Sequence, residues 1–367
     1  MDFQSVNLLN VQINIFSGNL FPMTADDSRF SIGWKIYSII TWSINISMNI
    51  LFFFGFTKVS KEKVISDGMI GIVILVEVCF IFTRIYACRD LVVQFIKKIN
   101  DILRVQDETM KCIVMATLKL MHSPLKFYWM SSMITVTMWT GMPLIMIFKK
   151  NSFFYEDYRL PFVITEQPFS MKIFALGSLC QMLSSIIIIM KKAAADIYMM
   201  HLVLLMTAQY RYVAVKLRKV FQKKNLQEGK IHSRKKLSSG KIDSWTEREM
   251  KSIYSHQSTI MELSLILKKF LSLNFSLIYI STILRFSFIG VILTSNVSTK
   301  ITDMAFHEKW YQFGSSIKRS FILMILSNNL KCEIALIKRF NLSLPSFMTV
   351  IKQAYSITLL CLKIIKK

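Results

Sequence analysis

The sequence predicts an all-α membrane protein, a bundle of helices that cross a lipid bilayer. Hydrophobic residues make up 53% of the 367 residues, and the mean hydropathy of +0.43 is too high for a soluble chain of this length. Apolar runs of spanning length recur along the chain, separated by basic connections. With six prolines and eleven glycines the chain has little room for flexible linkers, so residues 1–367 are expected to form a single transmembrane domain.

Six apolar segments reach the ~20 residues that are needed to cross the hydrocarbon core. They are Trp34–Phe56, Met69–Tyr86, Phe127–Phe148, Met171–Leu205, Phe270–Thr294 and Leu344–Ile364. The fourth segment is overlong and contains Lys191, Lys192 and Asp196, so its second half is expected to continue as a helix into the cytoplasm, with both lysines snorkelling. The fifth carries Arg285 in mid-span, where a charge costs a few kcal/mol unless it is paired. A weaker segment, Ile317–Ile337, is broken by charges and predicts a cytoplasmic amphipathic helix.

The last segment combines spanning length with a polar stripe. Helical spacing places one set of residues on a single face: Thr349, Lys352, Gln353, Ser356, Leu360 and Lys363. The other face is apolar: Phe347, Val350, Ile351, Ala354, Ile357 and Cys361. Because an unpaired polar group is costly in hydrocarbon, this helix either lines a pore or packs its stripe inside the bundle.

The distribution of Lys and Arg predicts a cytoplasmic N-terminus. The longest basic loop, Arg211–Lys251, and the basic loop Arg84–Lys111 both follow an even number of spans, and cytoplasmic loops carry excess positive charge. The short loop Lys58–Lys63 opposes this orientation but carries fewer charges. Residues 1–30 contain Asp2, and they lack the basic start and short apolar core of a signal peptide, so the first span is expected to act as its own insertion signal.

Several functional classes find no support in the sequence. The net charge of +24 suggests nucleic acid, but the basic residues lie mainly between apolar runs, and we predict no nucleic-acid partner. The six cysteines and five histidines have no metal or redox spacing, and no phosphate loop or nucleophile elbow is present. We therefore predict no enzyme activity, no cofactor and no metal. The sequon at Asn296, just after the fifth span on the outer side, is a glycosylation candidate.

The C-terminal stretch from Ala305 to Leu360 resembles the insect odorant receptors. Its landmarks follow one another in the family's order: Trp310-Tyr311, the basic turn Lys318-Arg319, the segment Phe321–Leu330, Leu342-Ser343-Leu344, Phe347, Ile351-Lys352 and Tyr355-Ser356. Weaker likeness comes from Asp196, His201 and Gln209 in the fourth segment and from His256-Gln257 before the fifth. The N-terminal half is similar mainly in hydropathy.

The resemblance implies a seven-span, inverted-topology subunit of a ligand-gated, nonselective cation channel. It implies an odorant-binding tuning subunit that assembles as a heterotetramer with the odorant co-receptor, in the plasma membrane of olfactory neuron dendrites. The ligand would be small, volatile and apolar, and lipid would surround the protein. The final helix of each of four subunits would form the pore, with Leu360 as the hydrophobic constriction and Ser356, Gln353 and Lys352 lining the inner vestibule. Packing of the same stripe against neighbouring helices is the alternative.

The same resemblance places an odorant pocket in the outer half of the bundle. Its candidate residues come from spans two, three and four: Val73, Glu77, Trp139, Met142, Phe174 and Met182. An apolar cavity with a few polar anchors suits such ligands. For each residue taken singly, ordinary bundle packing is the better explanation.

One feature departs from the family. A sixth span should separate the fifth from Trp310, but the intervening stretch, Ser295–Lys309, is too short and too polar to cross a bilayer. Three alternative explanations account for this difference: a skipped exon, a degenerate receptor gene or a working six-span variant.

Three other receptor or carrier classes remain as alternatives. A gustatory-type chemoreceptor channel usually ends in a Thr-Tyr and Gln-Phe pattern, whereas this chain has Tyr355-Ser356. A G-protein-coupled receptor needs its N-terminus outside and carries Asp-Arg-Tyr and Asn-Pro-x-x-Tyr motifs that are absent here. A transporter would show internal repeats or interrupted half-helices, and none is visible.

Overall fold

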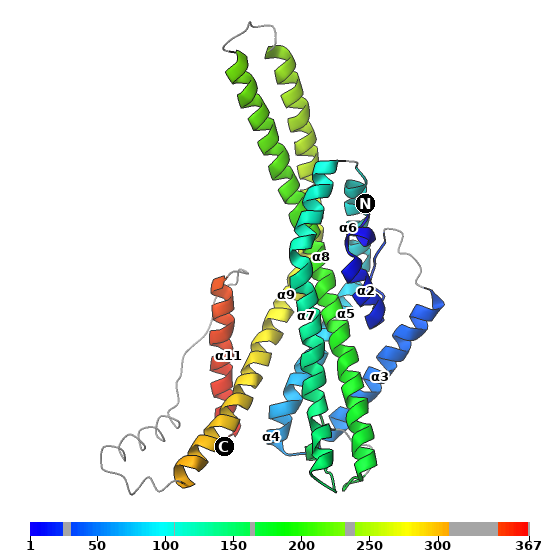
Figure 1. Ribbon diagram of the computed structural model, residues 1–367, viewed down its shortest axis with the longest axis vertical. Coiled ribbons are helices and arrows are strands. Elements are labelled where there is room, and N and C mark those ends of the chain that lie inside the picture. Colours follow the sequence, from blue (N-terminus) through cyan, green and yellow to red (C-terminus); the bar gives the residue numbers. More distant parts are fainter. Residues whose placement is uncertain (25–30, 106, 162–165, 232–238, 308–343, 366–367) are drawn as a thin grey trace, which may run out of the picture. The chain divides into compact units, whose positions relative to one another are not determined.

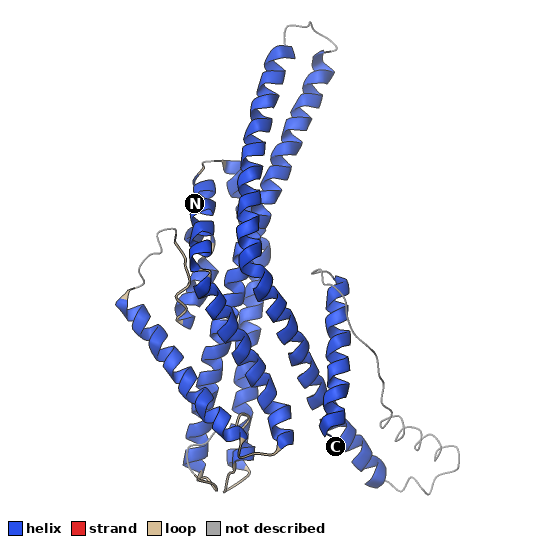
Figure 2. Ribbon diagram, turned by 180° about the vertical axis from the view of Figure 1, so that it is seen from behind, coloured by secondary structure: helices blue, strands red, loops and turns tan. Residues whose placement is uncertain are grey.

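The computed structural model describes residues 1–24, 31–105, 107–161, 166–231, 239–307 and 344–365. These residues are almost entirely helical and contain no strand, which confirms the predicted all-α class (Figure 2). They belong to two compact units. Unit 1 comprises residues 1–47, 78–141 and 179–274, and unit 2 comprises residues 48–77, 142–178 and 275–367.

Helices contain all six apolar segments, and several extend well beyond them (Figure 1). They are α3 (Ile32–Phe56), α5 (Met69–Ala87), α7 (Glu108–Gly141) with its 3₁₀ continuation η2 (Met142–Phe148), α8 (Met171–Ile231), α9 (Ser239–His307) and α11 (Leu344–Ile365). Among the described residues, five stretches are long and apolar enough to cross a membrane: Ile32–Phe56, Met69–Ala87, Glu108–Phe148, Met171–Gln222 and Arg248–Phe288.

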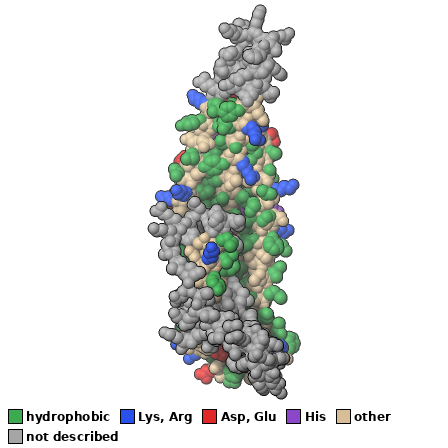
Figure 3. Space-filling view, turned by 90° about the vertical axis from the view of Figure 1, so that its left-hand side faces the viewer, with side chains coloured by type: hydrophobic (Ala, Val, Ile, Leu, Met, Phe, Trp, Pro, Cys, Tyr) green, Lys and Arg blue, Asp and Glu red, His purple; other side chains and the backbone are tan. Residues whose placement is uncertain are grey.

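The surface of these helices is unusually apolar. Helix α3 alone exposes a series of large hydrophobic side chains: Ile36, Ile39, Ile40, Ile46, Ile50 and Phe53. The face shown in Figure 3 carries hydrophobic side chains along the described helices, with Lys and Arg side chains among them. Such a surface is stable against lipid and would aggregate in water.

The described residues of the basic connection Arg211–Lys251 are helical and do not form a loop. Helix α8 runs on to Ile231 and α9 begins at Ser239, and the two run side by side here (Figures 1 and 2). No proline lies between Pro168 and Pro345, so nothing in the sequence forces either helix to end. Helix α9 likewise continues past Thr294 to His307, so the Asn296 sequon lies within a helix and not in a loop after the span.

Residues 308–343 lie outside the described residues. They contain the expected amphipathic helix Ile317–Ile337 and the landmarks Trp310-Tyr311 and Lys318-Arg319. The stretch Ser295–Lys309 is described up to His307, where it forms the C-terminal part of α9.

Three helices of unit 1 lie outside the predicted segments: α1 (Phe3–Val6), α2 (Leu8–Ser17) and α6 (Arg89–Arg104). Helix α6 buries one face: Val92, Phe95, Ile96, Ile99, Ile102 and Leu103. It also anchors α1, because the amide N–H of Phe3 donates to the Asn100 Oδ1 at 2.7 Å. These helices are amphipathic and too short to span, so a search for long apolar runs does not find them.

The end of α2 and the segment after it are held by side chains from three other helices, α3, α6 and α8. They donate to backbone carbonyls of this stretch: Tyr37 to Phe16 (2.8 Å), Lys191 to Ser17 (2.9 Å), Arg89 to Leu20 (3.1 Å) and Tyr198 to Pro22 (2.6 Å). The Lys191 side chain is fully buried, with its Nζ 5.0 Å from the centre of the Trp42 ring. Lys191 therefore does not snorkel, because the C-terminal carbonyl of α2 provides it with an internal acceptor.

Unit 2 has its own aromatic core, formed by Phe153, Tyr155, Tyr158, Phe169 and Phe174. The rings of Phe153 and Phe174 stack with centroids 4.2 Å apart and an interplanar angle of 9°. Unit 2 also contains two buried carboxylates that are ion-paired. Asp157 accepts from Lys150 at 2.6 Å, and Asp67, in the π-helix η1 (Val64–Gly68), pairs with Lys63 at 2.7 Å.

Candidate functional site

The predicted pore helix α11 packs against α9 within unit 2. Ile283 of α9 meets Val350 and Ala354 of α11 in a small buried cluster, with Tyr279 and Ile357 packed against it. Val350 and Ala354 are four residues apart, so they project from the same side of α11. Three residues of the apolar face that the sequence assigned to α11, Val350, Ala354 and Ile357, thus lie at its contact with α9, whereas Ile351 of the same predicted face is exposed.

Two hydrogen bonds fix the register of this contact. The Thr358 hydroxyl donates to the Ser287 carbonyl oxygen of α9 at 2.9 Å, and it also lies 2.8 Å from the Ala354 carbonyl of its own helix. The Tyr279 hydroxyl donates to the Gln353 Oε1 at 3.3 Å. In an apolar environment such bonds hold helices together without a hydrophobic driving force. Sequence reasoning missed Thr358, Ser287 and Tyr279, because a lone hydroxyl on an apolar helix has no distinctive pattern.

The opposite side of α11 has no cover from the described residues. Met348, Ile351 and Tyr355 are 52%, 43% and 59% exposed, and Lys352 is exposed beside them. These four residues form the free face of α11. Because three of the four are apolar, this face is suited to a neighbouring helix or lipid more than to bulk water.

The predicted pore residues lie in different surroundings on α11. Lys352 lies on the free face, while Gln353 bonds to α9 through Tyr279. Ser356 is half-buried between these two sides, and its hydroxyl donates to the Lys352 carbonyl of its own helix at 3.1 Å. The backbone of Leu360 belongs to α11, but its side chain lies outside the described residues. The polar stripe therefore runs along the edge between the free face and the α9 contact.

A second site in unit 2 is an ion pair between two apolar helices. The Arg285 Nη2 of α9 lies 3.2 Å from the Glu77 Oε2 of α5. The Glu77 side chain is fully buried, and that of Arg285 is 24% exposed. Arg285 also donates to the Thr282 hydroxyl of its own helix at 3.3 Å. The mid-span arginine thus has a partner of opposite charge, which removes most of the expected cost.

Four of the six predicted odorant-pocket residues lie in unit 2. Val73 is buried one turn before Glu77 on α5, and Glu77 is engaged with Arg285. Phe174 is fully buried in the aromatic core and stacks on Phe153, so it contributes to packing. Met142 begins η2 and is 54% exposed.

The remaining two candidates, Trp139 and Met182, lie in unit 1 and are both half-buried. A Cβ at Gly141 would lie 3.7 Å from the Met182 sulfur, which is ordinary van der Waals contact, so Met182 lies beside the end of α7. The odorant pocket stays a prediction for all six residues.

Unit 1 also holds a polar cluster between α7 and α8. The Tyr128 hydroxyl donates to the Asp196 Oδ2 at 2.5 Å, and the Lys192 Nζ pairs with the same oxygen. His201 places its Nδ1 2.8 Å from the Ile197 carbonyl, and Gln209 is fully buried. His201 and Gln209, quoted for the weaker sequence likeness, are therefore interior residues of unit 1, whereas Asp196, His256 and Gln257 are partly buried.

Among the comparisons with known proteins, only the comparison with solved structures gives a match. No family model and no curated protein sequence matches the chain. A solved structure, that of the insect olfactory receptor OR5 from Machilis hrabei, superposes with a TM-score of 0.58. The superposition covers 98% of this chain and 98% of the receptor, at 11% sequence identity. The chain thus has the fold of that receptor over nearly its full length.

Proposed function

We propose that this chain, with its insect olfactory receptor fold, is an odorant receptor: the odorant-binding tuning subunit of a heteromeric, ligand-gated, nonselective cation channel. The observation that carries the proposal is the full-length structural likeness to a solved insect olfactory receptor. The C-terminal motif from Leu342-Ser343-Leu344 to Tyr355-Ser356 supports it independently, because it depends on residue order and not on backbone shape. No enzymatic activity is proposed.

The pore is proposed to form from α11 and the equivalent helices of three partner subunits, including the odorant co-receptor. Two features support this role: α11 is fixed to α9 through Thr358 and Gln353, and it keeps a free face. Leu360 would provide the hydrophobic constriction, and Ser356, Gln353 and Lys352 would lie along the wider vestibule. In a heterotetramer, the free face would be covered by neighbouring subunits or lipid.

The odorant pocket is proposed in the outer half of the bundle, for a small and volatile apolar ligand. Val73 is the candidate best suited to touch such a ligand, because it is apolar and lies one turn before Glu77, which pairs with Arg285. The ion pair would border the pocket as a polar anchor. Phe174 would support the pocket wall through the aromatic core.

The proposed orientation has a cytoplasmic N-terminus, in the plasma membrane of olfactory neuron dendrites. The basic connection between α8 and α9 supports this orientation, because it would lie in the cytoplasm. An epitope tag at the N-terminus should be inaccessible to antibody on intact cells and accessible after permeabilisation. Staining of intact cells would instead favour a G-protein-coupled receptor.

The gate assignment is tested by Leu360→Ala in channels assembled with the co-receptor. Shortening a hydrophobic constriction widens and wets it, so resting cation current should rise severalfold at equal surface expression. Leu179→Ala, at an exposed position on α8, is the matched control and should leave resting current unchanged. Equal resting currents in both variants would contradict the gate assignment.

A further inference from the structure

Helix α2 of unit 1 turns its polar face inward and its apolar face outward. The large hydrophobic side chains of Leu8, Ile15 and Phe16 are exposed, with Leu8 and Phe16 each 65% exposed. The buried residues of the helix are mostly polar: Asn10, Ile13, Asn14 and Ser17. All ten residues of α2 are described, and Gln12 is the one exposed polar residue among them. This arrangement is the reverse of that in a helix on the surface of a water-soluble protein.

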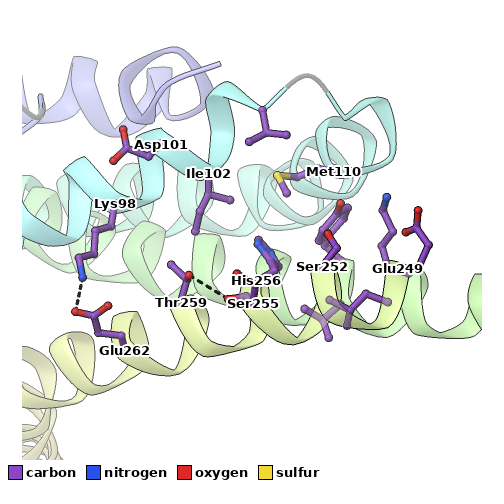
Figure 4. Close-up of a pocket in the computed structure, with 15 residues that line it drawn as sticks. Lys98, Asp101, Ile102, Met110, Glu249, Ser252, Ser255, His256, Thr259 and Glu262 are labelled. Atoms are coloured by element: carbon purple, nitrogen blue, oxygen red, sulfur yellow. Dashed lines mark hydrogen bonds and ion pairs between the residues drawn. The ribbon is translucent and has the colours of Figure 1, made fainter. Parts of the chain in front are cut away.

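Helix α6, in the same unit, has the usual arrangement. Its buried face is apolar, and the side chains of Gln94 and Lys97 are exposed. Lys98 and Asp101 border an open groove of about 640 Å³, in which Lys98 pairs with Glu262 of α9 (Figure 4). A helix with this pattern faces water. The two helices therefore have surfaces that suit different solvents.

Much of the buried polar face of α2 is hydrogen-bonded within the protein. The Asn14 Nδ2 donates to the Asn10 Oδ1 at 2.7 Å, and the Asn19 Nδ2 donates to the Asn14 Oδ1 at 3.0 Å. Asn19 also donates to the Lys191 carbonyl of α8 at 3.3 Å, and the Lys191 Nζ donates to the Ser17 carbonyl at 2.9 Å. Polar groups that bond to protein in this way can lie below the surface of a membrane, where water does not reach them.

The C-terminal end of α2 lies beside the first turns of the spanning helix α3. The Tyr37 hydroxyl donates to the Phe16 carbonyl at 2.8 Å, and a Cβ at Gly18 would lie 3.2 Å from the Thr41 hydroxyl oxygen. Tyr37 is about 8 Å along the helix axis from Ile32, where α3 begins. Because α3 is about 38 Å long and the hydrocarbon core is about 30 Å thick, Tyr37 falls inside the core. Phe16 is at the same depth.

The chain turns back toward the membrane surface directly after α2. Gly18 ends the helix with a φ of +70°, which glycine adopts readily. Two residues later, the Leu20 carbonyl accepts from Arg89, which begins α6 just after the spanning helix α5 ends at Ala87. Leu20 thus lies near the membrane surface, and the chain enters and leaves on the same side.

We propose that α2 is a re-entrant helix whose exposed Ile15 and Phe16 contact the acyl chains of the leaflet on the side of the N-terminus. The lipid-facing surface of α3 continues onto α2, because Ile36 and Ile40, which flank Tyr37, are exposed as well. Lipid that covers these isoleucines also reaches Phe16. Acyl chains are a favourable environment for such side chains, whereas water is not.

The test is photo-crosslinking of the full chain in phosphatidylcholine nanodiscs. Phe16→p-benzoylphenylalanine places a photoreactive ketone at position 16, which under ultraviolet light joins a neighbouring C–H group, and mass spectrometry identifies the adduct. Phosphatidylcholine should be joined at position 16. The same substitution at Ile39, 65% exposed on α3, is the positive control. At Gln94, exposed on α6, it is the matched negative control and should give severalfold less lipid adduct.

A lipid adduct at position 39 without one at position 16 would overturn the proposal, and so would equal lipid yields at positions 16 and 94. An adduct of position 16 with a second copy of this chain would also overturn it, and would assign this face to a protein interface.

Thermal unfolding in the same nanodiscs gives a second measurement. Phe16→Gln should lower the unfolding temperature by a few degrees, because it places an amide where the helix meets hydrocarbon. Tyr254→Gln is the matched control, since Tyr254 is 77% exposed on α9 beside exposed Lys251 and Ser252, and it should unfold like wild type. Equal unfolding temperatures for Phe16→Gln and wild type would contradict lipid contact at Phe16.

Discussion

The Arg285 guanidinium of α9 lies 3.2 Å from the fully buried Glu77 carboxylate of α5, and this pair joins two apolar helices inside unit 2. The two residues are far apart in the sequence, and neither has a charged partner at helical spacing on its own helix. The fold therefore brings each of these charges to a partner of opposite sign. Moving α5 away from α9 would separate the two charges, so the stability of unit 2 depends on how these helices are placed.

Glu77→Gln should destabilise the protein strongly. The substitution leaves Arg285 charged beside a neutral amide in an apolar setting, and breaking one side of a buried pair costs about 3 kcal/mol. The unfolding temperature in detergent and the fraction of protein at the cell surface should both fall.

The matched control for this substitution is Glu166→Gln, an exposed carboxylate of unit 2, which should unfold like wild type. Replacing both partners by apolar residues, Glu77→Leu with Arg285→Met, should recover most of the lost stability, because no charge remains unpaired. If Glu77→Gln alone unfolds at the wild-type temperature, the pair has no structural role.

Ala354→Leu should disrupt the contact of α11 with α9. Ala354 is 4% exposed and packs beside Ile283, so a larger side chain must displace α11 at a cost of about 1–3 kcal/mol. The unfolding temperature should fall, and the Thr358–Ser287 hydrogen bond should lengthen. Ala116→Leu makes the same chemical change at an exposed position of α7 and should have little effect. A similar loss in both variants would mean that the seam between α9 and α11 is not tightly packed.

Asp107 should give the protein an acid-sensitive contribution to stability. Burial alone would raise the pKa of its carboxyl, but hydrogen bonds from Tyr212, Lys216 and the Met110 amide, with the charge of Lys216, outweigh it and lower the pKa well below its usual range. Because the folded-state pKa is depressed, the stabilisation is complete above the unfolded-state value of about 3.9 and is lost as pH falls through the folded-state value.

The unfolding temperatures of wild type and Asp107→Asn should therefore differ by a constant amount between about pH 6 and pH 8. This difference should shrink below about pH 4, where the unfolded wild-type chain also becomes protonated. A difference that stays constant down to pH 3 would show that the Asp107 charge is not what joins the start of α7 to α8.

Lys191→Leu should loosen the N-terminal segment. It removes the donor to the Ser17 carbonyl at the end of α2 and leaves that acceptor buried without this bond, at a cost of about 1–3 kcal/mol. Backbone amides of residues 17–23 should exchange hydrogen faster. Lys126→Leu, at an exposed lysine of α7, is the control and should leave their exchange unchanged. Unchanged exchange in Lys191→Leu would mean that the other donors to this segment, such as Tyr198, hold it by themselves.

The long apolar helices were predictable from the sequence because each one is a continuous run of apolar residues. A run such as Ile32–Phe56 is apolar throughout, and only a helix can carry that run through lipid. Sequence reasoning did not find α6, whose apolar residues are spread over one face of a short helix. It also described Arg211–Lys251 as a loop, because charge patterning reports which side of a membrane a segment occupies and not its backbone conformation.

The candidate site was only partly predictable, because its contacts join residues that are distant in sequence. The apolar face of α11 was predicted from spacing, and Val350 and Ala354 lie at the α9 contact. Gln353, predicted to line a pore, is bonded to Tyr279, which no local pattern indicated. Phe174, chosen for an odorant pocket, is a core residue because the chain beyond η2 folds back and places Phe153 on its ring.

The most direct test of the central claim is whole-cell current recorded during application of a broad panel of volatile compounds. Cells would express this chain with an insect odorant co-receptor, with G-protein signalling blocked and surface delivery verified. The account predicts a cation current that is evoked by at least one compound and is absent from cells that express the co-receptor alone. Normal surface delivery with no evoked current across the whole panel would contradict a working receptor-channel subunit.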